Sequence, residues 1–377
     1  MYLQQQPQLM MKKYVLLFLL ALPVLTQAQS TEEEIEPSAD DFTLVPLNMG
    51  LFPPLTMNSL MGGNALNYIS MDAFMGLSAA VEGVQLSGFL GMVTHYVDGM
   101  QGAGFLAIAS ETQGAQLGGF GAISGPVTGI QAGGFFAIAS GPVAGAQAAG
   151  FINVAEVVNG IQGAGFMNLA YGETEEKSMQ AAGFMNIAGD VNMQASGFIN
   201  IAERAKGIQI GVINIADSAN YQLGLVNLSD NGHRHVTLWV SDLFLTNVGF
   251  KSGGDKLYAH IGVGYASLLP GRTWGTHAAL GWHLSPKLDL EMMVTNISDG
   301  RFFNDYPDVA PQIKLHYVLP ISDRLQITGG PSLNYLASFN GERAPTPLYW
   351  LWSDRNPTRN RYQYLWIGAQ AGIQVRL

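Results

Sequence analysis

The feature that most constrains this chain is a phrase of eleven residues that recurs along its middle. It has the form G-x-Q-x-small-G-F-x-N/A-x-A, and two neighbouring copies are GIQGAGFMNLA (160–170) and SMQAAGFMNIA (178–188). A spacing of about fifteen residues predicts one repeated structural unit over residues 83–229. The recurring glutamines are Gln85, Gln101, Gln116, Gln131, Gln147, Gln162, Gln180, Gln194, Gln209 and Gln222.

Written as an extended strand, the phrase divides into an amide face and an aliphatic face. Gln162 and Asn168 fall on one face, while Ile161 and Met167 fall on the other. If neighbouring copies paired antiparallel about the central glycine, each glutamine would face an asparagine and each phenylalanine would cover a small residue. The phrase therefore predicts antiparallel strands.

The length of the phrase suits a membrane. Eleven residues at about 3.3 Å each, tilted by about 45°, cover roughly 26 Å, close to the apolar thickness of an outer membrane. The favoured fold is therefore all-β: an antiparallel up-and-down outer-membrane β-barrel of about eighteen to twenty strands. It would be built from the repeats of about fifteen residues plus a C-terminal β-meander.

A β-solenoid followed by a C-terminal β domain is the alternative. The last two copies, GIQIGVINIA (207–216) and NYQLGLVNLS (220–229), are one residue short, which would move asparagine to the opposite face of a continuous strand. A bulge or a turn within the phrase would absorb the loss. Connections of equal, short length are also unusual for a barrel. In a solenoid, Gln would stack on Gln, Asn on Asn and Phe on Phe.

After residue 230 the repeat ends, but two-residue alternation continues. WGTHAALGWHL (274–284) puts His277 and His283 opposite its large apolar residues, and KLDLEMMVTN (287–296) does the same with Asp289 and Glu291. The final segment alternates up to Leu377, and an apolar last residue is expected of a closing outer-membrane strand, although it is more often aromatic. These patterns predict antiparallel strands with one apolar and one polar face, in a barrel or in a soluble sandwich.

The N-terminal segment has the features of an export signal. Lys12 and Lys13 precede an apolar run that ends in a small-residue cleavage site at Ala28. We expect a signal peptide over residues 1–28 and an acidic linker over 29–43. The repeat region would occupy 44–229, and the antiparallel region 230–377 would belong to the same barrel.

Composition excludes several functions. Lys+Arg number 18 against 28 Asp+Glu, which counts against nucleic acid as a partner, and zero Cys leaves no thiolate metal site or disulfide. No serine or carboxylate has a distinctive spacing to His277 or His283, and segments such as GAGF lack the Lys-Ser/Thr of a phosphate loop. We therefore expect no enzyme, no cofactor and no metal.

The functional residues predicted instead are polar side chains facing a barrel lumen. The partners would be outer-membrane lipid and the barrel-assembly machinery. The lumen-facing set is Gln162, Asn168, Gln180, Asn186, Gln194, Asn200, His260, His277, His283, Asp289 and Glu291.

The repeats resemble the GVQIAGLVNVA copies of a bacterial surface-repeat family, exported proteins of Gram-negative and spirochaete-type envelopes. DLFLTNVGFKSGGDKLYAHIGVGY (242–265) and the segment from Trp274 to Val294 resemble the non-repeat C-terminal part of that family. The resemblance extends from about Leu44 to Thr295 and implies an outer-membrane or surface location, without any established chemistry.

Three functions follow as hypotheses. The first is a non-catalytic integral outer-membrane barrel that acts as a pore or a structural envelope protein. The second is a surface-exposed β-repeat protein for adhesion or interaction. The third is an outer-membrane barrel enzyme that uses His277 and His283.

Overall fold

The computed structural model describes residues 42–58, 64–172, 178–298, 308–338, 346–356, 358 and 361–377. The predicted signal peptide and most of the predicted linker lie outside the described residues. The chain divides into two compact units, and each is described by itself. Unit 1 ends at Val143 and includes Ala155–Val157, and unit 2 comprises Ala144–Val154 and Val158–Leu377.

All the regular elements named in the two units are β-strands. Those of unit 1 are β1 (Thr43–Gly50), β2 (Ala65–Asp72), β3 (Met75–Ser78), β4 (Ala80–Ser87), β5 (Leu90–Ala103), β6 (Leu106–Gly118), β7 (Gly121–Ser124), β8 (Val127–Gly133) and β9 (Phe136–Ala139). The repeat strands that belong wholly or mostly to unit 2 are β10 (Val143–Ala149), β11 (Ile152–Ala155), β12 (Val158–Ala164), β13 (Met167–Ala170), β14 (Met179–Ala182), β15 (Met185–Ser196), β16 (Ile199–Ile210), β17 (Ile213–Leu223) and β18 (Val226–Ser229). Among the described residues, no helix has the length and apolar character needed to cross a membrane.

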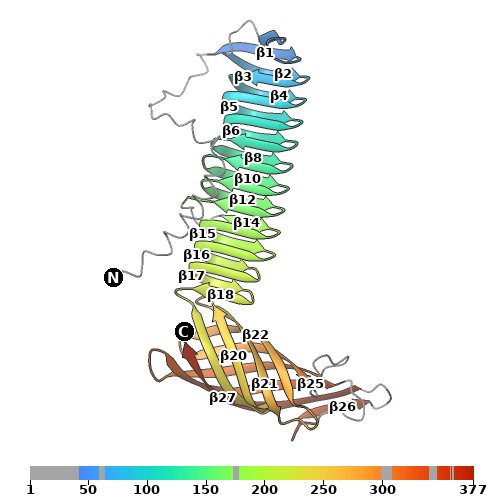
Figure 1. Ribbon diagram of the computed structural model, residues 1–377, viewed down its shortest axis with the longest axis vertical. Coiled ribbons are helices and arrows are strands. Elements are labelled where there is room, and N and C mark those ends of the chain that lie inside the picture. The colour runs from blue at the N-terminus through green and yellow to red at the C-terminus, as the bar shows by residue number, and fades with distance from the viewer. Residues whose placement is uncertain are drawn as a thin grey trace. The chain divides into compact units, whose positions relative to one another are not determined.

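Unit 1 is a stack of parallel coils, as the repeated short strands in Figure 1 show. Gln101 pairs in parallel register with Gln85 and Gln116, and Gln116 pairs with Gln131. The same residue type therefore lies at the same place in each successive coil. The predicted antiparallel pairing of Gln with Asn is wrong for these repeats, and the alternative, a β-solenoid, is correct.

Each phrase bends at its Gly-Phe pair instead of running straight. β8 contains Gln131, β9 contains Ala137, and Gly134 and Phe135 form the corner between the two strands. At these corners the phenylalanine rings stack: Phe105 and Phe120 lie 4.9 Å apart between ring centroids at an interplanar angle of 2°. An alternation of period two is compatible with this bent coil as well as with a straight strand, which is why the pattern alone favoured the wrong fold.

Glycine recurs at two positions of the phrase, and the physical reason differs between them. Gly114 has φ of 116°, a region that side chains disfavour, and a Cβ there would lie 2.1 Å from the backbone oxygen of Gly99. A Cβ on the corner glycine Gly119 would lie 2.0 Å from the backbone oxygen of Gly104. In this coil, the close approach to the coil before it is therefore possible only because both positions lack a side chain. The corner glycine recurs in every copy, whereas the first position is Ser178, Asn192 and Asn220 in three later copies.

The coils of unit 2 follow the same plan, including the two short copies. Gln180 pairs with Gln194, and Gln209 pairs with Gln222, all in parallel register. Three residues, 196–198, separate Ala195 from Ile199, whereas only Gly211 and Val212 separate Ile210 from Ile213. The missing residue is lost within the corner, so the amide columns continue without a change of face.

The C-terminal region of unit 2 has a different topology. Its strands are β19 (His233–Ser241), β20 (Phe244–Gly253), β21 (Leu257–Ser267), β22 (Trp274–Ser285), β23 (Leu288–Ser298), β24 (Asp308–Pro320), β25 (Leu325–Ser338), β26 (Trp352–Asn356) and β27 (Arg361–Arg376). Within the described residues, β19 to β25 pair antiparallel in chain order, β25 pairs with β27, and β27 pairs back with β19. Eight strands therefore close into a barrel of their own, and the prediction of one large barrel that includes the repeats is wrong.

The faces predicted for the C-terminal strands agree with their burial. On β21 and β23, His260 and Glu291 are buried, whereas Val263 and Val294 are 55% and 46% exposed. On these strands the barrel thus has polar side chains inside and aliphatic side chains on its outer wall.

Candidate functional site

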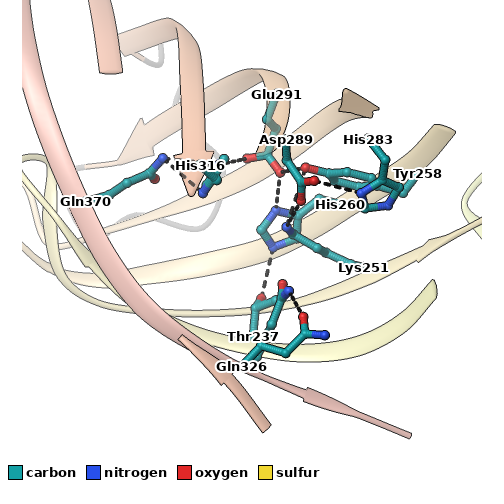
Figure 2. A network of polar contacts seen from close by, with 11 residues as sticks. Thr237, Lys251, Tyr258, His260, His283, Asp289, Glu291, His316, Gln326 and Gln370 are labelled. Carbon is teal, nitrogen blue, oxygen red and sulfur yellow. Dashed lines mark hydrogen bonds and ion pairs between the residues drawn. The ribbon is translucent and has the colours of Figure 1, made fainter. Parts of the chain in front are cut away.

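A network of charged and polar side chains fills the middle of the C-terminal barrel (Figure 2). Its centre is the fully buried Glu291 of β23. Oε2 of Glu291 lies 2.9 Å from Nδ1 of His260 and accepts a hydrogen bond of 3.2 Å from the hydroxyl of Tyr258. Oε1 lies 3.5 Å from Nε2 of His316. Strands β21 and β24 therefore supply polar partners to one carboxylate of β23, as burial of a charge requires.

A second carboxylate, Asp289, lies on the same face of β23 two residues earlier. One of its oxygens is 2.7 Å from Nδ1 of His283, and the other is 3.7 Å from Nζ of Lys251. Lys251 also donates to the Tyr258 hydroxyl at 3.4 Å. Figure 2 shows the groups around Asp289 and Glu291 meeting inside one barrel. The two carboxylates thus belong to a single network.

His277 lies in a separate polar group. Its Nδ1 is 2.9 Å from Oγ1 of Thr295, and its Nε2 is 2.9 Å from Oδ1 of Asn247. The ring of Trp239 lies beside it, with the centroids 5.5 Å apart. With both nitrogens bonded and an indole against its face, His277 has the surroundings of a packed interior residue.

Apolar side chains fill the end of the barrel beyond His277. They form one buried cluster: Leu243, Phe244, Leu269, Ile297, Ala310, Leu336, Tyr364 and Trp366. Arg272 forms a buried ion pair with Asp308 at the same end. The cavity that remains around His260, Glu291 and His316 measures about 10 Å³, which is room for about one water molecule. The described side chains leave no space there for a substrate or a solute.

A larger cavity of about 430 Å³ opens at the opposite end of the barrel, beside the turns that follow β20 and β22. His233, Asp255, Lys256, His283 and Asp289 line it. The rings of His233 and His283 lie 4.0 Å apart between centroids. No cluster of three or more His, Cys, Asp or Glu suited to a metal ion occurs among the described residues. The cavity contains charged groups but no metal-binding constellation.

The six predicted amides lie in the solenoid and not in a barrel lumen. They are buried between the two faces of the coils of unit 2: Gln162, Asn168, Gln180, Asn186, Gln194 and Asn200. Gln180 donates to Gln162 at 2.8 Å, and Asn168 donates to Asn186 at 2.9 Å. The prediction that these residues face a lumen was therefore wrong, because the aliphatic side of the repeat is the outer surface of a coil.

The five other predicted residues, His260, His277, His283, Asp289 and Glu291, all point into the C-terminal barrel. Sequence reasoning missed several partners of this group, among them Thr237, Lys251 and His316, together with Lys314, whose charge interacts with that of Glu291. The signal for two of them was available, since IKLHYV (313–318) alternates and puts Lys314 and His316 on one face. No sequence pattern shows which strands become neighbours around the closed barrel.

Protein-family models, curated proteins and solved structures were compared with this chain, and none of them matches it.

Proposed function

We propose that this chain is a non-catalytic interaction protein of the bacterial outer membrane, in which the C-terminal barrel is a lipid-embedded anchor and the β-solenoid is the surface that partners bind. One observation carries the proposal. The closed antiparallel barrel exposes aliphatic side chains on its outer wall while it buries Glu291, Asp289 and Lys314 inside. Such a wall is stable in hydrocarbon and unfavourable in water.

The dimensions of the strands support a membrane anchor. β20 to β25 have 10 to 14 residues, and a tilted membrane strand needs about 9 to 11. The exposed aliphatic positions occur on strands all around the barrel, including Leu238, Val248, Val294, Ile313 and Ile367. Because the eight described strands β19–β25 and β27 close on themselves, none of these eight is an edge strand with a row of unpaired backbone groups in the bilayer.

The filled interior favours an anchor over a pore or an enzyme. The central cavity of about 10 Å³ is bounded by the Glu291 network on one side and by the apolar cluster around Phe244 on the other. Buried ion pairs of this kind fix a structure but provide no path for a solute. The interior therefore acts as a plug that joins the strands.

The solenoid supports the interaction role through its regular outer surface. Successive coils present similar side chains in columns, such as Phe151, Phe166, Phe184 and Phe198 in unit 2, whose neighbouring rings stack 4.8 to 5.2 Å apart. Each of these rings is more than one third exposed. Stacked repeats give an extended surface of this type, which is how solenoid proteins bind their partners.

The anchor is tested by adding the purified chain to lipid vesicles and floating the vesicles through a density gradient. The wild type should float with the vesicles. On gels, unboiled samples should migrate differently from boiled samples, because the barrel stays folded only in the unboiled ones. Val263→Lys combined with Val294→Lys should lose both properties, because a lysine on the lipid face costs about 2 to 4 kcal/mol at the bilayer midplane.

Ile161→Lys is the matched control, since Ile161 is as exposed as Val263, at 55%, but lies on the solenoid. This variant should float like the wild type. A wild-type chain that stays monomeric in water without any amphiphile would contradict the proposal.

A further inference from the structure

The two ends of the C-terminal barrel differ in the length of their connections. At the end where β19 begins, the turns are residues 254–256, 286–287 and 321–324, none longer than four residues. At the other end, besides the tight turn 242–243, the sequence has six residues between β21 and β22, nine between β23 and β24 and thirteen between β25 and β26. In outer-membrane barrels the short turns face the periplasm and the long connections face outward.

The solenoid is attached at the short-turn end. The backbone nitrogens of Asp255 and Lys256, in the turn after β20, donate to the carbonyl oxygens of Ala219 and Asn220 in β17, each at 3.0 Å. The side chain of Asn227 in β18 donates to the backbone oxygen of Ser252 at 3.2 Å. The last coils are therefore bonded directly to the end that has the short turns.

The filled interior rules out passage of the coils through this barrel. A segment that precedes a barrel could reach the far side only through the lumen, and here Trp239, Glu291 and Phe244 are among the side chains that occupy it. The cavity of about 10 Å³ at the centre of the barrel does not hold even one backbone segment. The solenoid therefore lies on the side of the membrane at which β19 starts.

We infer that the solenoid projects into the periplasm, so that its partner is a component of the periplasmic space or of the inner side of the envelope and not a ligand outside the cell. The inference rests on the proposed membrane anchor. In this orientation the coils lie between the outer and the inner membrane and are not displayed on the cell surface.

The absence of cysteine from the chain permits a direct test by labelling single cysteines in intact Gram-negative cells that produce the protein. Three exposed positions are suitable: Asn159 on the solenoid, Lys287 in a short turn and Thr273 in a long connection. A maleimide that cannot cross membranes should label Thr273→Cys in intact cells. It should label Asn159→Cys and Lys287→Cys only after the outer membrane is permeabilised.

Labelling of Asn159→Cys in intact cells would overturn the inference, whether or not Thr273→Cys is also labelled. Cell fractionation separates this failure from that of the anchor. A chain found in the soluble fraction contradicts the proposed function, whereas a chain in the outer-membrane fraction with an externally labelled solenoid contradicts only its sidedness. Pro270→Cys, in the same long connection, replaces Thr273→Cys if that variant does not show the mobility shift of the folded barrel.

Discussion

Gln180 donates one amide hydrogen to Oε1 of Gln162 in the preceding coil, at 2.8 Å, and donates again to the backbone oxygen of Ile187 in its own coil, at 3.1 Å. Gln194 then donates to Gln180 at 2.9 Å. Asparagines form a second column whose donors point the other way, from Asn168 to Asn186. A buried amide that uses both hydrogens and its oxygen is fully satisfied, so these columns can replace an apolar core.

Replacement of Gln180 by leucine should open the column. Gln162 would lose a donor and Gln194 an acceptor, and buried groups left without partners cost about 1 to 3 kcal/mol each. Hydrogen exchange should become faster in β14 and β15 of the folded protein. Met179→Leu is the control, because Met179 lies on the outer face of the same strand. Equal protection in the Gln180→Leu variant and the wild type would show that the column does not stabilise the coils.

Two glycines in one copy should respond differently to alanine. A Cβ on the corner glycine Gly165 would lie 2.0 Å from the backbone oxygen of Gly150, whereas no described atom lies within 4 Å of a Cβ on Gly163. Gly165→Ala should therefore destabilise the solenoid by about 1 to 3 kcal/mol, the range for overpacking. Gly163→Ala should be neutral or slightly stabilising. Urea unfolding followed by circular dichroism distinguishes the two, and similar midpoints would contradict the close approach at the corner.

The sequence predicted the position of individual strands much better than it predicted which strands pair. Alternation placed His260, His277 and Glu291 on one face of their strands, and that face is the interior of the barrel. The same alternation in the repeats said nothing of whether copies pair parallel or antiparallel. The short copies contained part of the missing information, because a corner within the phrase lets Gln209 and Asn214 both stay buried, whereas a continuous regular strand would not.

The Glu291 network inside the barrel leads to a further prediction. Glu291→Ala leaves His260 and Tyr258 without their shared acceptor and removes the carboxylate beside His316. Breaking a buried charged pair from one side costs about 3 to 5 kcal/mol. The barrel should unfold at lower urea concentration in detergent, as followed by the mobility shift on gels. Glu291→Gln should lose less, since its amide oxygen still accepts one hydrogen bond. The outward neighbour Met292→Ala is the control, and a midpoint for Glu291→Ala equal to that of Met292→Ala would contradict the role of the network.

The raised pKa of Asp72, at the end of β2, predicts that the stability of unit 1 depends on pH. Burial raises the pKa of its carboxyl group, although hydrogen bonds from Ser70 and Asn48 oppose the shift. A raised pKa in the folded state means that the charged form disfavours folding. This penalty is present at neutral pH and disappears as the pH falls through the raised pKa toward the ordinary value of about 4.

Asp72→Asn should therefore protect the amides of β1 and β2 more strongly than the wild type at neutral pH, since its neutral side chain can still accept from Asn48. The difference between the two proteins should shrink as the pH falls. Hydrogen exchange at several pH values, corrected for the intrinsic rate, measures it. Asp98→Asn, which changes an exposed carboxylate on β5, should leave β1 and β2 unchanged. A difference for Asp72→Asn that grows toward acidic pH would mean that the charged form of Asp72 stabilises the coil through Ser70 and Asn48.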